Sequence, residues 1–123
     1  MRTFVAISLF ALAPYTLAYE LVFVGNPSTK TELVSDKVTQ KNLNAARQQE
    51  LQVAIVKKGA RYFWKTREMK ELEKHESGKF TTYLATDGAG YIKIDSNASQ
   101  ATAYIEHLTL GLNTITYQGW VVK

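Results

Sequence analysis

Short runs of β-branched and aromatic residues, separated by glycines and polar turns, follow one another through the second half of the chain. The clearest are Phe80–Thr86 and Tyr91–Asp95, joined by a four-residue loop that contains two glycines. Two strands around such a loop predict a β-hairpin. Ile92 and Ile94 lie on the same side of the second strand, so we expect that side to face the core.

A different spacing appears before these strands. Four apolar residues recur near the 3.6-residue period of a helix: Leu43, Ala46, Leu51 and Ala54. The sequence Lys57-Lys58-Gly59 is typical of a helix C-terminus, since cations and then a glycine favour that end. We therefore predict a helix from about residue 40 to 58, capped by Asn42 or Asn44. The β-branched residues around Ile55 leave open an earlier helix end followed by a strand.

Further strands are predicted at 19–24, 61–66, about 72–76 and 113–120, with a turn at 25–28. The segment 67–76 has a second helix as its alternative. Two segments stay open: 31–40 as strand or loop, and 102–110 as helix or strand.

Together these elements predict an α+β domain, with one long helix packed on a twisted antiparallel sheet of about four to six strands. This layout is similar to that of cystatin-like and other small α+β export-pathway domains. The likeness is one of architecture alone, because the chain lacks the glutamine-valine-glycine loop of cystatins, and it therefore implies no function.

The N-terminus has the form of an export signal. A basic start at Met1–Thr3 precedes an uncharged apolar run, Phe4–Ala13, and the segment ends in Ala18. A run of about ten apolar residues fits a signal peptide and is shorter than the roughly 20 residues needed to cross a bilayer. We expect a signal peptide over 1–18, cleaved after Ala18, and a single secreted or periplasmic domain over 19–123 without a transmembrane segment. A retained anchor or a short buried strand is the alternative.

Composition excludes several kinds of chemistry. The chain has no cysteine, which rules out disulfides, a thiol nucleophile and a cysteine-ligated zinc. It also lacks the G-x-S-x-G, H-E-x-x-H, P-loop and G-x-G-x-x-G motifs. Its two histidines each adjoin a glutamate, and neighbours on a strand point to opposite faces, so joint metal ligation is not expected. No cofactor is predicted.

The charge is concentrated in one stretch. Between Lys57 and Lys79 there are eight basic and four acidic residues, around the aromatic triplet Tyr62-Phe63-Trp64. Cations beside aromatic rings suit sugars, anionic polymers or a protein partner, and nucleic acid is not expected. The candidate ligand-binding residues are Lys57, Lys58, Arg61, Tyr62, Trp64, Lys65 and Arg67. Core packing of the rings, and self-pairing of charges that alternate in sign, are the competing explanations.

A second, weaker candidate site comprises Tyr104, Glu106 and His107. These residues suit a polar cluster at the mouth of a pocket, with Glu106 orienting a ligand or acting as a general base. The competing explanation is a strand with one wet face.

The sequence therefore predicts a small exported binding or inhibitor-type domain without catalytic activity, engaging an acidic or carbohydrate-bearing partner through a basic and aromatic surface. One alternative is a small hydrolase that uses His107 and Glu106. The other is a structural envelope protein that associates through a strand edge.

Overall fold

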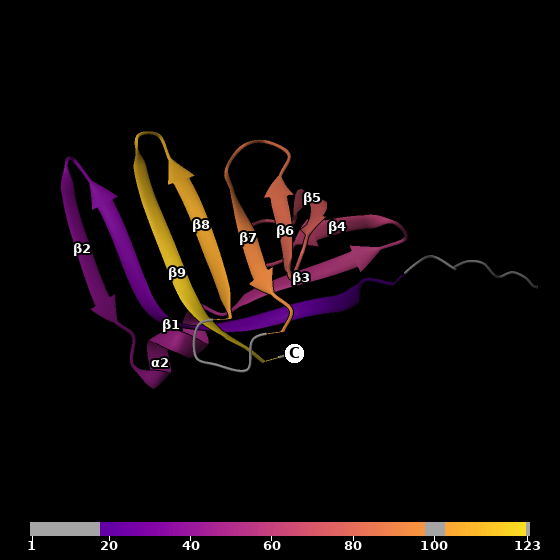
Figure 1. Cartoon of the computed structure of the whole chain (residues 1–123), viewed down its shortest axis with the longest axis horizontal. Helices are drawn as coiled ribbons and strands as arrows, with labels where there is room; N and C mark the ends of the chain where they lie inside the picture. The colour runs from indigo at the N-terminus through magenta and orange to yellow at the C-terminus, as the bar shows by residue number, and fades with distance from the viewer. Residues whose placement is uncertain (1–17, 98–102, 123) are drawn as a thin grey trace, which may run out of the picture.

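The computed structural model describes residues 18–97 and 103–122, and nearly all of this part of the chain lies in one antiparallel sheet (Figure 1). The elements in chain order are β1 (Glu20–Val34), β2 (Lys37–Asn42), α2 (Ala45–Glu50), β3 (Val53–Lys58), β4 (Arg61–Trp64), β5 (Lys70–Ser77), β6 (Phe80–Ala85), β7 (Gly90–Asp95), β8 (Tyr104–Leu110) and β9 (Asn113–Val121).

The sheet closes on itself through β1. The first part of β1 pairs with β3, from Glu20 opposite Lys57 to Gly25 opposite Val53. Its second part pairs with β9, from Gly25 opposite Val121 to Leu33 opposite Thr114. Eight strands therefore form a closed antiparallel barrel. The ninth, β2, pairs with the second part of β1 along the edge opposite β9.

Two glycines make this closure possible. A Cβ on Gly119 would fall on the backbone carbonyl oxygen of Asn26, in the β1–β9 pairing. A Cβ on Gly25 would overlap the ring of Tyr104. The pairing of β1 also shifts between Pro27 and Thr29, so the strand bends as it passes from one neighbour to the other. The turn predicted at 25–28 is therefore wrong, because β1 continues through this bend.

The barrel interior is filled by large side chains rather than left hollow. Buried apolar residues from every strand of the barrel meet there, among them Phe23, Val53, Ile55, Trp64, Leu72, Tyr83, Ile92, Tyr104, Leu108 and Tyr117. Among the described residues one charged side chain, Glu106, is buried with them.

The predicted α+β class is wrong. The helix expected over 40–58 is only α2, which buries none of its residues. Asn44 does cap it, accepting a hydrogen bond from the backbone N–H of Arg47 at 2.9 Å. The chain then becomes β3, because Val53 and Ile55 alternate into the barrel with no exposed surface. The expected four to six strands are nine in the described residues, and the cystatin-like layout is excluded with the long helix.

The strand predictions in the second half fared better. The hairpin of β6 and β7 is confirmed, with Ile92 fully buried and Ile94 packed against the core. The strands β4, β5 and β9 lie where they were predicted. The open segment 31–40 contains the end of β1 and the start of β2, and the described part of 102–110 forms β8.

Except for Ala18, the predicted signal peptide lies outside the described residues. Within the described residues, no helix is long and apolar enough to span a bilayer.

Closure at Gly119 gives a first prediction. Gly119→Ala should lower the free energy of unfolding by about 2 kcal/mol or more, since the added methyl meets rigid backbone. The matched control is Gly78→Asn, because Gly78 has a left-handed φ of 61°, no atom lies within 4 Å of its would-be Cβ, and asparagine tolerates this conformation. Urea unfolding of both variants measures the effect, and equal losses would contradict the role given to Gly119.

Candidate functional site

The strongest candidate site lies on the outer wall of the barrel, across β1, β3 and β4. Leu21 pairs with Val56, and Val56 with Phe63, so these three side chains share the outer face. Lys58 pairs with Arg61 on the same face. The neighbouring positions Ile55 and Trp64 point inward and are fully buried.

Around these strands lies a surface that we call the outer patch, made of Tyr19, Leu21, Lys58, Arg61, Phe63, Lys65 and Met69. A shallow pocket of about 440 Å³ at its centre is lined by Tyr19, Leu21, Val56, Lys65 and Met69. Tyr19 is 51% exposed, and its ring meets the Phe63 ring edge to face at 5.8 Å. The patch therefore combines exposed apolar surface with a concave centre.

The cations of the outer patch lie against its rings. The Nζ of Lys58 is 5.0 Å from the centre of the Tyr19 ring, and the Cζ of Arg61 is 5.3 Å from that of Phe63. The contact with Met69 depends on the β4–β5 turn, where Glu68 and Met69 have left-handed φ values of 58° and 56°. Two consecutive non-glycine residues in this conformation are strained, as are Ser35 and Asp36 in the β1–β2 turn, so the strain belongs to tight hairpin turns and fixes where Met69 lies.

Charge pairing separates the basic residues of the stretch Lys57–Lys79 into two groups. Five of the eight form ion pairs with carboxylates: Arg61, Arg67, Lys70, Lys74 and Lys79. Arg61 holds Glu71 with two hydrogen bonds of 2.9 and 3.0 Å. Within the described residues Lys57, Lys58 and Lys65 have no ion-pair partner, so the outer patch keeps two lysines, Lys58 and Lys65, available for a ligand.

The predicted basic-aromatic residues therefore do not form one surface. Lys58, Arg61 and Lys65 lie on the outer patch, whereas Lys57 and Tyr62 pair on the inner side of β3 and β4. Lys57 and Lys74 both lie over the Tyr62 ring, at 5.9 and 5.4 Å from its centre. Trp64 is a core residue with no exposed surface, as the core-packing explanation held.

Arg67 and Glu106 belong to a polar network inside the barrel. The Nε of Arg67 donates to Glu106 Oε2 at 3.2 Å, and the indole Nε1–H of Trp64 donates to the same oxygen at 2.9 Å. Glu106 is 1% exposed, while the Arg67 side chain is 30% exposed and its guanidinium lies 5.9 Å from the centre of the Tyr117 ring. A residue in the β4–β5 turn thus reaches across the barrel to β8.

Burial sets the protonation behaviour of this network. It raises the pKa of Glu106 above its usual range, although Arg67 and Trp64 both favour the carboxylate. Glu106 in turn raises the pKa of Arg67, which stays cationic. Three buried side-chain atoms have no hydrogen-bond partner among the described residues: Glu106 Oε1, the hydroxyl of Tyr104 and, in β1, Asn26 Oδ1. Burial also raises the pKa of Tyr104.

The residues of the second candidate site point apart. Tyr104 and Glu106 face the interior, whereas His107 lies on the outer face, stacked on Tyr91 at 5.1 Å and hydrogen-bonded to Thr116 at 2.9 Å. His107 therefore cannot share a proton directly with Glu106.

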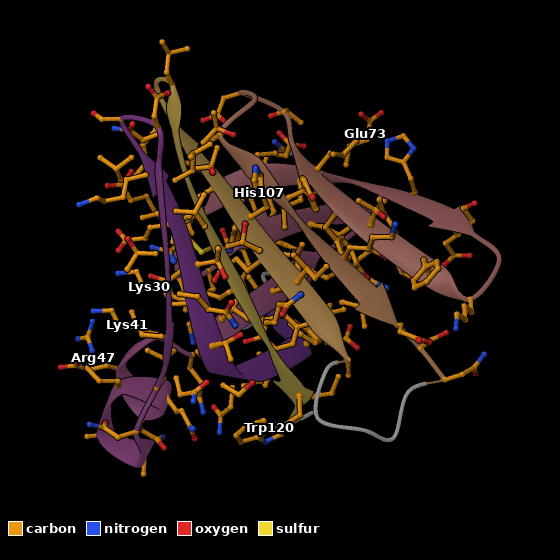
Figure 2. The ribbon with its side chains drawn as sticks, turned by 60° about the vertical axis from the view of Figure 1, so that its left-hand side comes forward. Lys30, Lys41, Arg47, Glu73, His107 and Trp120 are labelled. Carbon is orange, nitrogen blue, oxygen red and sulfur yellow. The ribbon has the colours of Figure 1, made fainter. Side chains whose placement is uncertain are left out.

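The second histidine is also distant from His107. His75 lies on β5, 3.5 Å from Glu73, and β6 and β7 separate β5 from β8. Figure 2 shows Glu73 well apart from His107. Three strand spacings amount to roughly 14 Å. Within the described residues no group of three His, Asp or Glu side chains is placed to hold a metal ion.

Sequence reasoning left four members of the outer patch out of the candidate site: Tyr19, Leu21, Phe63 and Met69. It named Tyr62 and Trp64 from the aromatic triplet, and the other three missed residues come from the start of β1 and from a turn, far from the triplet in sequence. Strand alternation already gave two choices for the triplet, Phe63 buried or Phe63 exposed. The burial of Trp64 decides between them.

The raised pKa of Glu106 predicts a pH dependence. A carboxyl whose pKa is higher in the folded than in the unfolded state contributes stability below about pH 4.3 that is lost as the pH rises through the folded value. The unfolding free energy of the wild type, measured relative to Glu106→Gln, should therefore fall from pH 4 to pH 8. Urea titrations across this range test the slope.

The control for this experiment is Glu71→Gln. Arg61 lowers the pKa of Glu71, so the same difference should rise with pH up to about pH 4.3 and stay level from there to pH 8. The titrations for this control therefore extend below pH 4. If the unfolding free energy relative to Glu106→Gln rose with pH, as expected for Glu71, the ion pair with Arg67 would outweigh the effect of burial on the pKa of Glu106.

No protein-family model, no curated protein and no solved structure matches this chain.

Proposed function

We propose that the protein is a small exported, non-catalytic binding domain that engages an acidic or carbohydrate-bearing partner through the outer patch. The observation that carries the proposal is the position of two unpaired lysines, Lys58 and Lys65, beside the exposed ring of Tyr19 and a shallow pocket.

Both halves of the patch contribute to such recognition. Lysines without an internal carboxylate partner can neutralise an anionic ligand without first breaking an ion pair. Exposed aromatic rings offer flat apolar faces, which suit sugars and the apolar parts of a protein partner. The apolar floor formed by Leu21 and Val56 gives the ligand a surface to pack against.

The expected removal of the signal peptide would add to the positive charge of the outer patch. Cleavage after Ala18 would make Tyr19 the first residue of the mature protein, and its new α-amino group would add a positive charge beside Lys58. The catalytic alternative gains no support from the geometry, since Glu106 and His107 lie on opposite faces of β8.

The proposal predicts selective loss of binding on charge reversal. The double variant Lys58→Glu/Lys65→Glu should weaken binding to an immobilised acidic polysaccharide such as heparin by about tenfold or more, because two exposed ionic contacts become repulsive. Retention of the wild type should also fall at about 1 M salt, where charges are screened beyond roughly 3 Å. Affinity chromatography and titration against the soluble polysaccharide measure both effects.

The matched control is Lys37→Glu/Lys41→Glu. It makes the same change in net charge at two exposed lysines on β2 that form no ion pair in the described part of the chain. Equal weakening by both double variants would mean that net charge alone governs binding, and would overturn the proposal. Tyr19→Ala tests the aromatic component, since its effect should persist at high salt.

A further inference from the structure

Exposed aliphatic side chains gather at the tips of two neighbouring hairpins, away from the outer patch. Leu110 and Leu112 at the β8–β9 tip are 55% and 98% exposed. The β1–β2 tip adds Leu33, Val34 and Val38, which are 39%, 43% and 68% exposed. The tips are adjacent, since Leu33 pairs with Thr114 of β9, and both rise at the same end of the barrel (Figure 1).

Turn chemistry does not account for Leu112. Leu110 pairs with Asn113, so Gly111 and Leu112 form a two-residue turn in which Gly111 has a left-handed φ of 68°. Glycine supplies the conformation that such a turn requires, and the position after it favours no apolar residue. The corresponding turn between β1 and β2 holds the polar pair Ser35-Asp36. A leucine that is almost fully exposed at a turn tip indicates contact with an apolar environment.

The part of the β8–β9 hairpin beyond Glu106 and His107 is also free of charge. From Leu108 to Val122 the sequence contains no Asp, Glu, Lys or Arg. This tip can therefore leave water without desolvating an ionised side chain, a cost that would otherwise oppose burial. The neighbouring tip carries Asp36 and Lys37, so it suits the boundary between water and an apolar phase rather than its interior.

The shape and charge of this end favour a lipid surface as the occupant. Leu112 protrudes from a convex tip, and a bilayer accepts such a tip without a preformed pocket. Lys37 is exposed at the start of β2, beside the β1–β2 tip, and can reach anionic headgroups. Lys41 and Arg47 lie farther down the same flank, away from the tips (Figure 2). Their charge and the net positive charge of the chain favour approach to an anionic surface without direct headgroup contact.

We propose that the β8–β9 tip inserts into the interfacial layer of an anionic bilayer, with Leu112 deepest and the β1–β2 tip resting at headgroup level. This peripheral contact orients the barrel with the hairpin tips toward the lipid. The outer patch is on the wall of the barrel and remains accessible, so membrane contact and binding through the outer patch are independent.

The test is co-sedimentation of residues Tyr19–Lys123, which contain every described strand, with vesicles of phosphatidylcholine alone or mixed with phosphatidylglycerol. The wild type should bind the mixed vesicles more strongly. Leu112→Asp should reduce the partition coefficient by about 10-fold or more, because a carboxylate would have to enter the interfacial layer. Leu112→Trp should bind, and the blue shift of its tryptophan emission when vesicles are added should exceed that of the wild type.

The matched control is Leu84→Asp, which places the same charge at a leucine on the outer wall of β6 that is 39% exposed. It should leave the partition coefficient within about twofold, and circular dichroism should show that both aspartate variants fold. Equal losses for the two variants, or no binding of the wild type to either vesicle, would overturn the proposal. So would light scattering that shows a wild-type dimer which Leu112→Asp converts to a monomer without changing vesicle binding.

Discussion

Closure of the barrel depends on the ability of one strand, β1, to pair with β3 along its first half and with β9 along its second. That exchange of neighbours requires backbones to approach more closely than a side chain allows, at Gly119 against Asn26 and at Gly25 under the Tyr104 ring. The Oγ of Ser28, at the bend, donates a hydrogen bond to the Gln118 carbonyl at 3.1 Å and ties the two strands together. The faces of all the other strands follow from this closure, because it decides which side of each strand is interior.

The alternation of side chains along β4 positions both the buried network around Glu106 and the outer patch. Trp64 points inward and donates to Glu106, which fixes the inner face of β4. Phe63, one residue earlier, must then point outward. There its ring contacts the Tyr19 ring and the Arg61 guanidinium of the outer patch. Arg67 continues the same link, because its bond to Glu106 holds the β4–β5 turn from which Met69 reaches the patch. The buried carboxyl group of Glu106 and the exposed outer patch are thus linked through Trp64, Arg67 and the β4–β5 turn.

The sequence predicted strands well where alternation was strong and local. The β6–β7 hairpin was recognisable because two β-rich runs flank glycines, and the inward side of β7 was read correctly from Ile92 and Ile94. The prediction of a long helix was wrong because Leu43 and Ala54 matched a helical period by coincidence. Both residues are buried, but they lie outside α2. In the short α2 nothing is buried, so no packing extends it. Barrel closure was out of reach because it depends on β1 pairing with a strand almost ninety residues away, and periodicity records only local neighbours.

The kinds of residue in the candidate site could be predicted from the sequence, but not which residues come together to form it. Charge and aromatic content identified the stretch around Trp64, and alternation offered the correct division between faces as one of two choices. The contributions of Tyr19 and Met69 depend on strand order and on a strained turn, neither of which leaves a periodic signal. Glu106 was noticed as a polar residue on a strand, yet its interior position follows only from the register of β8 with β7 and β9.

The pairing of β1 with β9 also has a consequence for biosynthesis. Every strand from β4 onward can form a hairpin with the one before it as soon as both have been made, but β1 keeps an unpaired edge until β9 arrives. Contacts of such long sequence separation form late and slow the folding of a chain. A nascent chain therefore completes its barrel only after residue 121 is free of the ribosome, and until then the edges of β1 and β8 that pair with β9 stay open.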